Sequence, residues 1–475
     1  MDNNLLDKKY FPLFLLFACI LSRILTAIYY VEDIDSLRFA LSLQEFSLVK
    51  LQPHFPGYPI FCFIAKILYS FTGNMGISFA LIGGLSVFII IYFSLKICKT
   101  DPVSYTGLFI TALLFINPLI WLMGNRYMPD LMGLGILIMS LYYLLFDNEQ
   151  NKYLNYGFFI AGILLGIRVS YFPLLIIPII YIISIHQNKI KCIYSFIIGI
   201  GIWFVPLVYI TGFEQLIYLA SKQTIGHFTD FGGTVITEFN WYERITYFIK
   251  SLWADGLGGF WIGRAWPTII TSICIFLLLY QYRYLKNWSW FSKNHYQLIL
   301  FSIIIYIAWV LLFQNVIYKS RHILPVLLFA ILFIVQGYRY YRVYQPFIAN
   351  MIAIVLFLSL IQITYTLTAQ HKIPNAISQL TTYVEELDDS LDVISIPLIN
   401  YYLKTHGVNK NFVDIDIHKE QNLNQITNIR KNNIVIGDFR KLFEENYNII
   451  PDTIFYHNPY VNRMWSKIET YQLIK

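Results

Sequence analysis

Long apolar runs recur along most of the chain and constrain its fold more than any motif. The expected membrane spans are residues 11–30, 76–97, 105–122, 129–146, 154–168, 171–186, 190–210, 265–284, 297–314, 321–336 and 346–368. A helix needs about 20 predominantly apolar residues to cross a bilayer. Because 57% of the residues are hydrophobic and only 13% are charged, the chain is too apolar for one soluble core. The sequence therefore predicts a polytopic α-helical membrane protein with about 11 transmembrane helices.

Residues 58–72 form a shorter apolar run that contains Lys66. A run of this length fits an interfacial or re-entrant helix better than a full crossing. If it does not cross, basic pairs recur on the same side as the amino terminus: Lys8 and Lys9, Lys96 and Lys99, Lys189 and Lys191, Arg339 and Arg342. Since cytoplasmic loops carry excess Lys and Arg, we expect a cytoplasmic amino terminus. The net charge of +7 then needs no nucleic-acid partner.

The same topology places the unusual polar residues on the opposite, extracytoplasmic side. They are Glu32, Asp33, Asp35, His54, Arg126, Asp130, Arg168, His227, Arg264, Lys319, Arg321 and His322. An ionisable side chain at the end of a span costs a few kcal/mol against lipid, so it usually faces a polar cavity. We therefore expect one outward-facing cavity that these residues share. Lys222, Arg244 and Lys250 are expected to be solvated loop charges.

Four motifs carry a resemblance to a known family. Residues 33–40 read D-I-D-S-L-R-F-A, and residues 53–58 read P-H-F-P-G-Y. Residues 126–130 read R-Y-M-P-D, and residues 319–325 read K-S-R-H-I-L-P. With the multispan body, this pattern resembles the GT-C superfamily of glycosyltransferases, which includes protein O-mannosyltransferases and lipid A aminoarabinose transferases. The acidic motif here is D-x-D, whereas those families have two adjacent acids.

The resemblance implies an enzyme that takes a sugar from a polyprenyl-phosphate donor and transfers it with inversion on the extracytoplasmic side. It places Asp35 at the catalytic position, Asp33 at the accessory acidic position and His54 at the loop histidine. It also implies that Asp130 begins a later span and that the segment with Arg321 lies near the donor phosphate.

The chemistry supports the same roles. The acceptor hydroxyl needs a base, for which we choose Asp35, and the departing phosphate needs cations. Lys319 and Arg321 are the first choices for those cations, and Arg126, Arg168 and Arg264 are reserves, because guanidinium offers two parallel donors to phosphate. The other expected substrate contacts are His54, Tyr58, Asp130, His227 and His322. The residues specify no cofactor and leave a divalent metal ion open, since Asp33, Asp35 and His54 include ligand types for such an ion.

Two segments between the spans have their own patterns. Residues 36–49 place apolar and polar residues on opposite faces, which predicts an amphipathic interfacial helix that fixes Asp35. Residues 211–264 are expected to form a long outer loop. Its motif G-H-F-T-D-F-G-G at 226–233 predicts a lid over the pocket, with His227 inside it.

The composition changes to polar after residue 368, which predicts two domains, 1–368 and 369–475. In the second, short apolar runs at V-I-S-I, F-V-D-I-D-I, I-V-I-G-D-F and T-I-F-Y alternate with helical stretches at 398–405 and 419–430. Alternating strands and helices predict a small extracytoplasmic α/β domain.

The expected function is therefore an inverting glycosyltransferase of a bacterial inner membrane. Its partners would be a polyprenyl-phosphate-linked sugar, a glycan, lipid or protein acceptor, and membrane lipids. Two alternatives stay open. A lipid-linked glycan transporter or flippase would also use cations in an outward cavity, although it should carry ionisable residues at mid-span or on both sides. An assembly or scaffold protein would carry the D-x-D motif incidentally.

Overall fold

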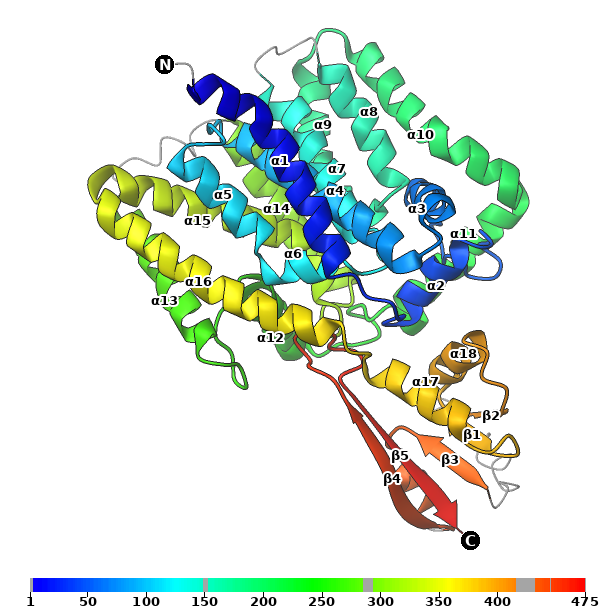
Figure 1. Cartoon of the computed structure of the whole chain (residues 1–475). Helices are drawn as coiled ribbons and strands as arrows, with labels where there is room; N and C mark the ends of the chain where they lie inside the picture. Colours follow the sequence, from blue (N-terminus) through cyan, green and yellow to red (C-terminus); the bar gives the residue numbers. More distant parts are fainter. Residues whose placement is uncertain (1–2, 148–152, 285–293, 416–431, 445, 475) are drawn as a thin grey trace. The chain divides into compact units, whose positions relative to one another are not determined.

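The structure is a computed structural model that describes residues 3–147, 153–284, 294–415, 432–444 and 446–474 (Figure 1). The chain divides into two compact units. The first contains Met1–Ile28 and Arg38–Ala369, and the second contains Tyr29–Leu37 and Gln370–Lys475. The acidic segment near the amino terminus thus groups with the carboxy-terminal residues, whereas the sequence analysis assigned it to the transmembrane body.

The first unit consists of helices. They are α1 (Asn3–Leu25), most of α2 (Ile34–Ser42), α3 (Pro59–Thr72), α4 (Met75–Ile97), α5 (Tyr105–Phe115), α6 (Pro118–Met123), α7 (Asp130–Leu141), η1 (Tyr142–Phe146), α8 (Leu154–Leu165), η2 (Val169–Tyr171), α9 (Pro173–Ile185), α10 (Lys189–Thr211), α11 (Phe213–Gly226), η3 (His227–Phe231), α12 (Trp241–Lys250), η4 (Ser251–Gly256), α13 (Pro267–Tyr280), η5 (Gln281–Tyr284), α14 (Asn294–Phe313), η6 (Ser320–Ile323), α15 (Leu324–Tyr344) and α16 (Pro346–His371) except its last two residues, which belong to the second unit. Within the described residues, five helices are long and apolar enough, by length and composition, to cross a membrane, and shorter apolar helices accompany them. The chain is an integral membrane protein, and the predicted polytopic helical class is confirmed.

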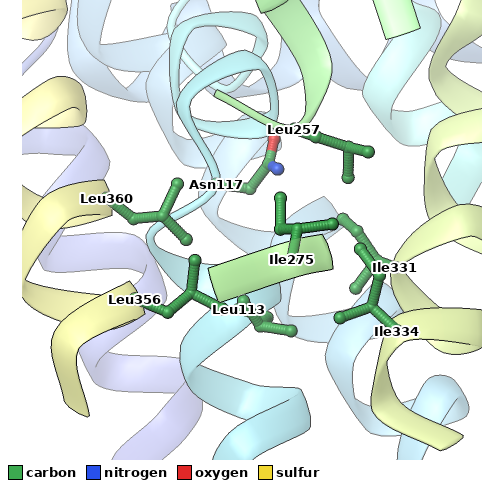
Figure 2. Close-up of a pocket in the computed structure, with 8 residues that line it drawn as sticks. All are labelled: Leu113, Asn117, Leu257, Ile275, Ile331, Ile334, Leu356 and Leu360. Atoms are coloured by element: carbon green, nitrogen blue, oxygen red, sulfur yellow. The ribbon is translucent and has the colours of Figure 1, made fainter. Parts of the chain in front are cut away.

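The expected span at 105–122 is two helices, α5 and α6. Pro118 has no backbone N–H to continue a helix, and Asn117 caps α6 by accepting a hydrogen bond from Ile120 N at 3.0 Å. Asn117 also donates to Gly256 O at 2.7 Å. Figure 2 shows Asn117 among apolar side chains from several helices, including Leu113 and Leu360. An amide in such surroundings is tolerated because both of its ends are hydrogen-bonded.

Two segments between the predicted spans differ in detail from their sequence predictions. The interfacial helix expected at 36–49 is the shorter α2, because a backbone bridge pairs Ser47 with Gln52 at 2.8 Å in both directions. The segment expected as a loop at 211–264 contains α11, η3, α12 and η4. Its helices mix apolar with charged residues, so an apolar run of membrane length does not reveal them. Asn240 begins α12 by accepting from Glu243 N at 3.2 Å.

The approach of α8 to α10 fixes the end of α8. A side chain at Gly199 would lie 2.3 Å from Phe159 O, so only glycine permits this distance between the helices. Near the end of α8, Trp203 Nε1 donates to Gly162 O at 3.0 Å. The helix then stops at Leu165, three residues before Arg168.

The second unit contains a five-stranded sheet covered by helices. Its elements are α17 (Ala376–Glu386), β1 (Asp392–Ser395), α18 (Pro397–Thr405), β2 (Asn411–Asp414), β3 (Asn433–Ile436), α19 (Arg440–Phe443), β4 (Asn448–Tyr456) and β5 (Lys467–Ile474). The strand order is β2-β1-β3-β5-β4. Strand β1 is parallel to β2 and β3, while β5 is antiparallel to β3 and β4. Ile394, Val435 and Tyr471 form part of its core.

This sheet confirms the predicted small carboxy-terminal α/β region. The four expected strands match β1 to β4, and the helical stretch at 398–405 matches α18. Strand β5 was not predicted. The helical stretch expected at 419–430 lies outside the described residues.

Candidate active site

The motif P-H-F-P-G-Y forms a turn that leads into α3. Gly57 and Tyr58 both have left-handed backbone conformations, with φ of 90° and 46°, and Gly57 N donates to His54 O at 2.9 Å. His54 Nε2 lies 3.1 Å from the Tyr58 hydroxyl oxygen. The turn is held from outside by Gln223, whose Oε1 accepts from Phe55 N at 2.6 Å. The turn therefore presents the Tyr58 hydroxyl from a fixed backbone.

The Tyr58 hydroxyl contacts a buried ion cluster, which consists of Asp130, Arg168 and Arg321. Arg168 Nη1 donates to the Tyr58 hydroxyl at 3.4 Å, and Arg168 Nη2 lies 2.8 Å from Asp130 Oδ1. The other carboxylate oxygen of Asp130 lies 3.8 Å from Arg321 Nε. The three charged side chains are at most 8% exposed, so their interactions are weakly screened by water. Residues that are distant in the sequence thus meet around Asp130.

The backbone of α7 makes room for Arg168. Asp130 is the first residue of α7, and Gly133 lies one turn later on the same face. A Cβ at Gly133 would lie 2.6 Å from Arg168 Cβ, so a larger residue would displace that side chain. The spacing D-x-x-G therefore serves both the charge and the packing of Arg168.

The segment from Arg168 to Tyr171 carries polar atoms without a hydrogen-bond partner among the described residues. These buried atoms are Arg168 Nε, Ser170 Oγ and the Tyr171 hydroxyl. Tyr171 is fully buried, and its ring lies 5.8 Å from the Arg168 guanidinium carbon. Buried polar groups are normally satisfied, so such a concentration of donors next to a cation calls for a polar ligand.

The motif K-S-R-H forms the short helix η6. Arg321 and His322 are buried, and Tyr306 from α14 donates its hydroxyl to His322 O at 2.9 Å. The Tyr306 ring also packs edge-on against Tyr171, with centroids 6.0 Å apart. Lys319 comes directly before η6 and is half-buried. Thus η6 is fixed through its backbone while Arg321 reaches Asp130.

His227 begins the π-helical turn η3, and its place in a lid over the pocket stays a prediction. Its Nε2 lies 3.0 Å from Phe313 O, at the end of α14. Burial lowers the pKa of His227, the bond to Phe313 O raises it, and the charges of Lys319 and Arg168 lower it further. The net effect favours neutral imidazole, which donates from Nε2 to this carbonyl.

Arg244 was expected to be a solvated loop charge, and this was wrong. It is fully buried and donates to Leu311 O, Gly233 O and Gln314 O at 2.8 to 2.9 Å. The arginine thereby ties the segment after η3 to the end of α14. The sequence gives no signal for this role, because carbonyl partners leave no pattern in side-chain identities.

The other two candidate arginines, Arg126 and Arg264, contact residues that are near them in the sequence. Arg264 donates from Nη1 to Ala254 O and also reaches Gly259 O at 3.5 Å. Arg126 Nη1 lies 3.9 Å from Met123 Sδ. Their predicted contacts with substrate stay predictions.

The acidic segment belongs to the second unit. Asp33 caps α2, because its Oδ1 accepts from Ser36 N at 2.8 Å and its backbone oxygen accepts from Leu37 N at 2.9 Å. Asp35 lies in the first helical turn, where the helix dipole favours a carboxylate. Glu32 Oε1 lies 2.8 Å from His371 Nε2. The catalytic roles of Asp33 and Asp35, and the cavity they would share with Arg321, stay predictions.

The divalent metal site expected at Asp33, Asp35 and His54 stays a prediction. Among the residues that the structure describes, no group of three or more His, Cys, Asp or Glu side chains is arranged to hold a metal ion. His54 belongs to the first unit, and Asp33 and Asp35 belong to the second. The three expected ligands are therefore divided between the two units.

Comparison with known proteins identifies the fold. No protein-family model and no curated protein matches the chain. A crystal structure of ArnT from Cupriavidus metallidurans bound to undecaprenyl phosphate is similar, with a TM-score of 0.53 and 10% identity, over 96% of this chain and 97% of that one. The apo structure of the same protein gives a TM-score of 0.51 with the same identity and shares. ArnT is a lipid A aminoarabinose transferase, so the chain has the GT-C fold that the motifs implied.

Proposed function

We propose that the chain is a membrane glycosyltransferase that moves a sugar from a polyprenyl-phosphate donor to a hydroxyl acceptor at the extracytoplasmic face. The fold supports this proposal, since ArnT shares it over nearly the whole length and has been crystallised with undecaprenyl phosphate. The low identity leaves the donor sugar and the acceptor to be decided from this chain's own site.

The buried cluster around Asp130 is the observation that carries the proposal. Arg168 and Arg321 both contact one carboxylate, and Arg168 Nε and the Tyr171 hydroxyl have no partner among the described residues. Phosphate accepts several charge-assisted hydrogen bonds, and guanidinium is the side chain best matched to it. A phosphoryl group at this place would satisfy those donors.

The proposed reaction follows from these groups. Asp35 takes the proton of the acceptor hydroxyl, and the acceptor oxygen forms a bond to the anomeric carbon. The bond from that carbon to the phosphate oxygen breaks, and its electron pair leaves with the polyprenyl phosphate. Arg168 and Arg321 stabilise the charge that develops on the phosphate. Attack opposite the leaving group inverts the configuration.

The test uses purified full-length protein in lipid nanodiscs. Binding of undecaprenyl phosphate and transfer from polyprenyl-phosphate sugars are measured for wild type, Arg168→Gln and Lys50→Gln. Lys50 is the matched control, because it is an exposed cation of the same unit that pairs with Glu45 at 2.7 Å. We expect Arg168→Gln to lower transfer by about 100-fold or more and Lys50→Gln to leave it unchanged.

Other outcomes would oppose the proposal. Equal transfer by Arg168→Gln and wild type would remove the assigned phosphate site. If wild type moves lipid-linked sugar across a liposome membrane without transferring it, the chain is a transporter. Reporter fusions after residue 475 test the extracytoplasmic placement, since a periplasmic reporter should be active there.

A further inference from the structure

The carboxy-terminal unit holds the acidic segment through the backbone that precedes the two aspartates. Val31 O accepts hydrogen bonds from the Tyr402 hydroxyl at 2.7 Å and from Ser378 Oγ at 2.9 Å. Glu32 O accepts from Asn375 Nδ2 and, at 3.3 Å, from Asn462 Nδ2. Two consecutive carbonyls are therefore each held by two side chains of the same unit.

The side chains of the segment make further contacts. Glu32 Oε1 lies 2.8 Å from His371 Nε2, and both side chains are almost completely buried, at 1% and 0% exposure. Because a carboxylate only accepts hydrogen bonds, His371 donates from Nε2. The backbone of His371 is also held, because the Tyr30 hydroxyl donates to His371 O at 2.9 Å. A buried hydrogen bond lies in a medium of low dielectric constant, so the bond between Glu32 and His371 is stronger than an exposed one.

The anchored residues stand directly before the predicted catalytic group. Asp33 follows Glu32 and caps α2, so the chain is fixed by the second unit at residues 31 and 32 and by its own helix from residue 33 onward. Asp35 has little freedom between these points. Among the three acids of the segment, Glu32 serves as the anchor.

We infer that the carboxy-terminal unit positions the catalytic carboxylate, with Glu32 and His371 as positioning residues. This inference rests on the proposed function, since it concerns the placement of Asp35 in that reaction. A base must lie within hydrogen-bond reach of its proton, and a misplacement of 1 Å costs about 100-fold in rate. The unit thus has a positioning role in the proposed reaction.

The experiment combines hydrogen exchange with steady-state kinetics on the full-length protein. His371→Leu removes the donor at nearly constant volume, and His371→Gln restores one. Tyr402→Phe removes only a hydroxyl and serves if the leucine variant does not fold. Arg440→Gln is the matched control, because it breaks an exposed ion pair with Asp438 in the same unit.

We expect faster exchange of the amides of residues 29–37 in His371→Leu and Tyr402→Phe, with slower exchange regained in His371→Gln. We expect kcat for transfer to fall tenfold or more in His371→Leu, with the donor KM within twofold of wild type. Tyr402→Phe should lower kcat by a smaller factor. The control should match wild type in both measurements.

Two results would overturn the inference. Unchanged exchange at residues 29–37 would show that these contacts do not hold the segment. Faster exchange with unchanged kcat would show that anchoring of residues 29–37 does not affect the reaction. If wild type transfers no sugar at all, the proposed function fails, and the exchange result still decides whether the unit anchors the segment.

Discussion

Both units hold a buried carboxylate in a polar network, Asp130 in the first and Glu32 in the second, and the two networks differ in the partners of that carboxylate. Asp130 in the first unit is shared by Arg168 and Arg321, beside donors that have no partner among the described residues. Glu32 in the second unit meets His371, and side chains around it bond to the backbone. The first network is suited to receive an anion, whereas the second is suited to fix a segment. Burial of a charge alone therefore does not identify a binding site.

The largest effect is expected from Asp130→Asn. The change leaves two guanidinium groups buried without their shared carboxylate, which costs about 3–5 kcal/mol for a buried pair. Thermal unfolding in detergent and the transfer assay should both show a severe loss. Asp389→Asn is the control, since Asp389 is 94% exposed in its pair with Lys410. If Asp130→Asn lost less thermal stability and less transfer activity than Glu32→Gln, the network around Asp130 would not be the more sensitive of the two.

A smaller effect is expected from Gly133→Ala, which changes no charge. The new Cβ would lie 2.6 Å from Arg168 Cβ, and overpacking of this kind costs about 1–3 kcal/mol. Undecaprenyl phosphate should bind more weakly because Arg168 is displaced. Gly201→Ala is the control, because no atom lies within 4 Å of a Cβ at this helical position. Unaltered binding in Gly133→Ala would mean that the position of Arg168 is not critical.

Ser378→Ala tests the second network at one hydroxyl, which also lies 3.4 Å from the Tyr402 hydroxyl. The variant removes the hydroxyl donor to Val31 O, which is worth about 0.5–1.5 kcal/mol. The midpoint temperature of thermal unfolding should fall slightly, and the backbone amides of Val31 and Glu32 should exchange hydrogen faster. Thr382→Ala, one turn later on α17, removes a longer bond to Ser378 O at 3.4 Å and should change neither measurement. Equal results for the two variants would contradict the anchoring role.

The smallest effect concerns pH. The pKa of His227 is lowered from the model-peptide value of about 6.5, mainly by burial, so the unfolded chain takes up a proton before the folded one does. Its contribution to stability is present above about pH 6.5 and is lost as the pH falls below that value. We expect the loss of thermal stability between pH 7.5 and 5.5 to be smaller in His227→Gln than in wild type. An identical pH profile would exclude His227 as a source of acid sensitivity.

The sequence predicts the helices well, and it groups three charged residues that lie together in the structure. Apolar runs specify α4, α10 and α14 directly, because backbone groups in lipid must bond within a helix. The topology argument also placed Asp130, Arg168 and Arg321 in one outward cavity, and the structure brings these three together. Their roles in catalysis stay predictions.

Other parts left no pattern to read. Tyr171 and Tyr306 looked like ordinary aromatic residues of apolar segments, although both line the ion cluster. Arg244 bonds to carbonyls, which every residue carries. The partners of Glu32 lie in a region where composition changes, and no local spacing connects His371 to the start of the chain. Long-range pairing of single polar residues is the information that one sequence does not contain.

The separation of Glu32 from its partners has a consequence for biosynthesis. His371 lies 339 residues after Glu32, and Asn462 lies 430 residues after it. At about 5–20 residues per second, a ribosome reaches Asn462 on the order of tens of seconds after it has incorporated Glu32. During that time, the D-x-D segment has been synthesised without the residues that hold it. A nascent chain that has not yet reached His371 would thus leave Glu32 without this buried partner.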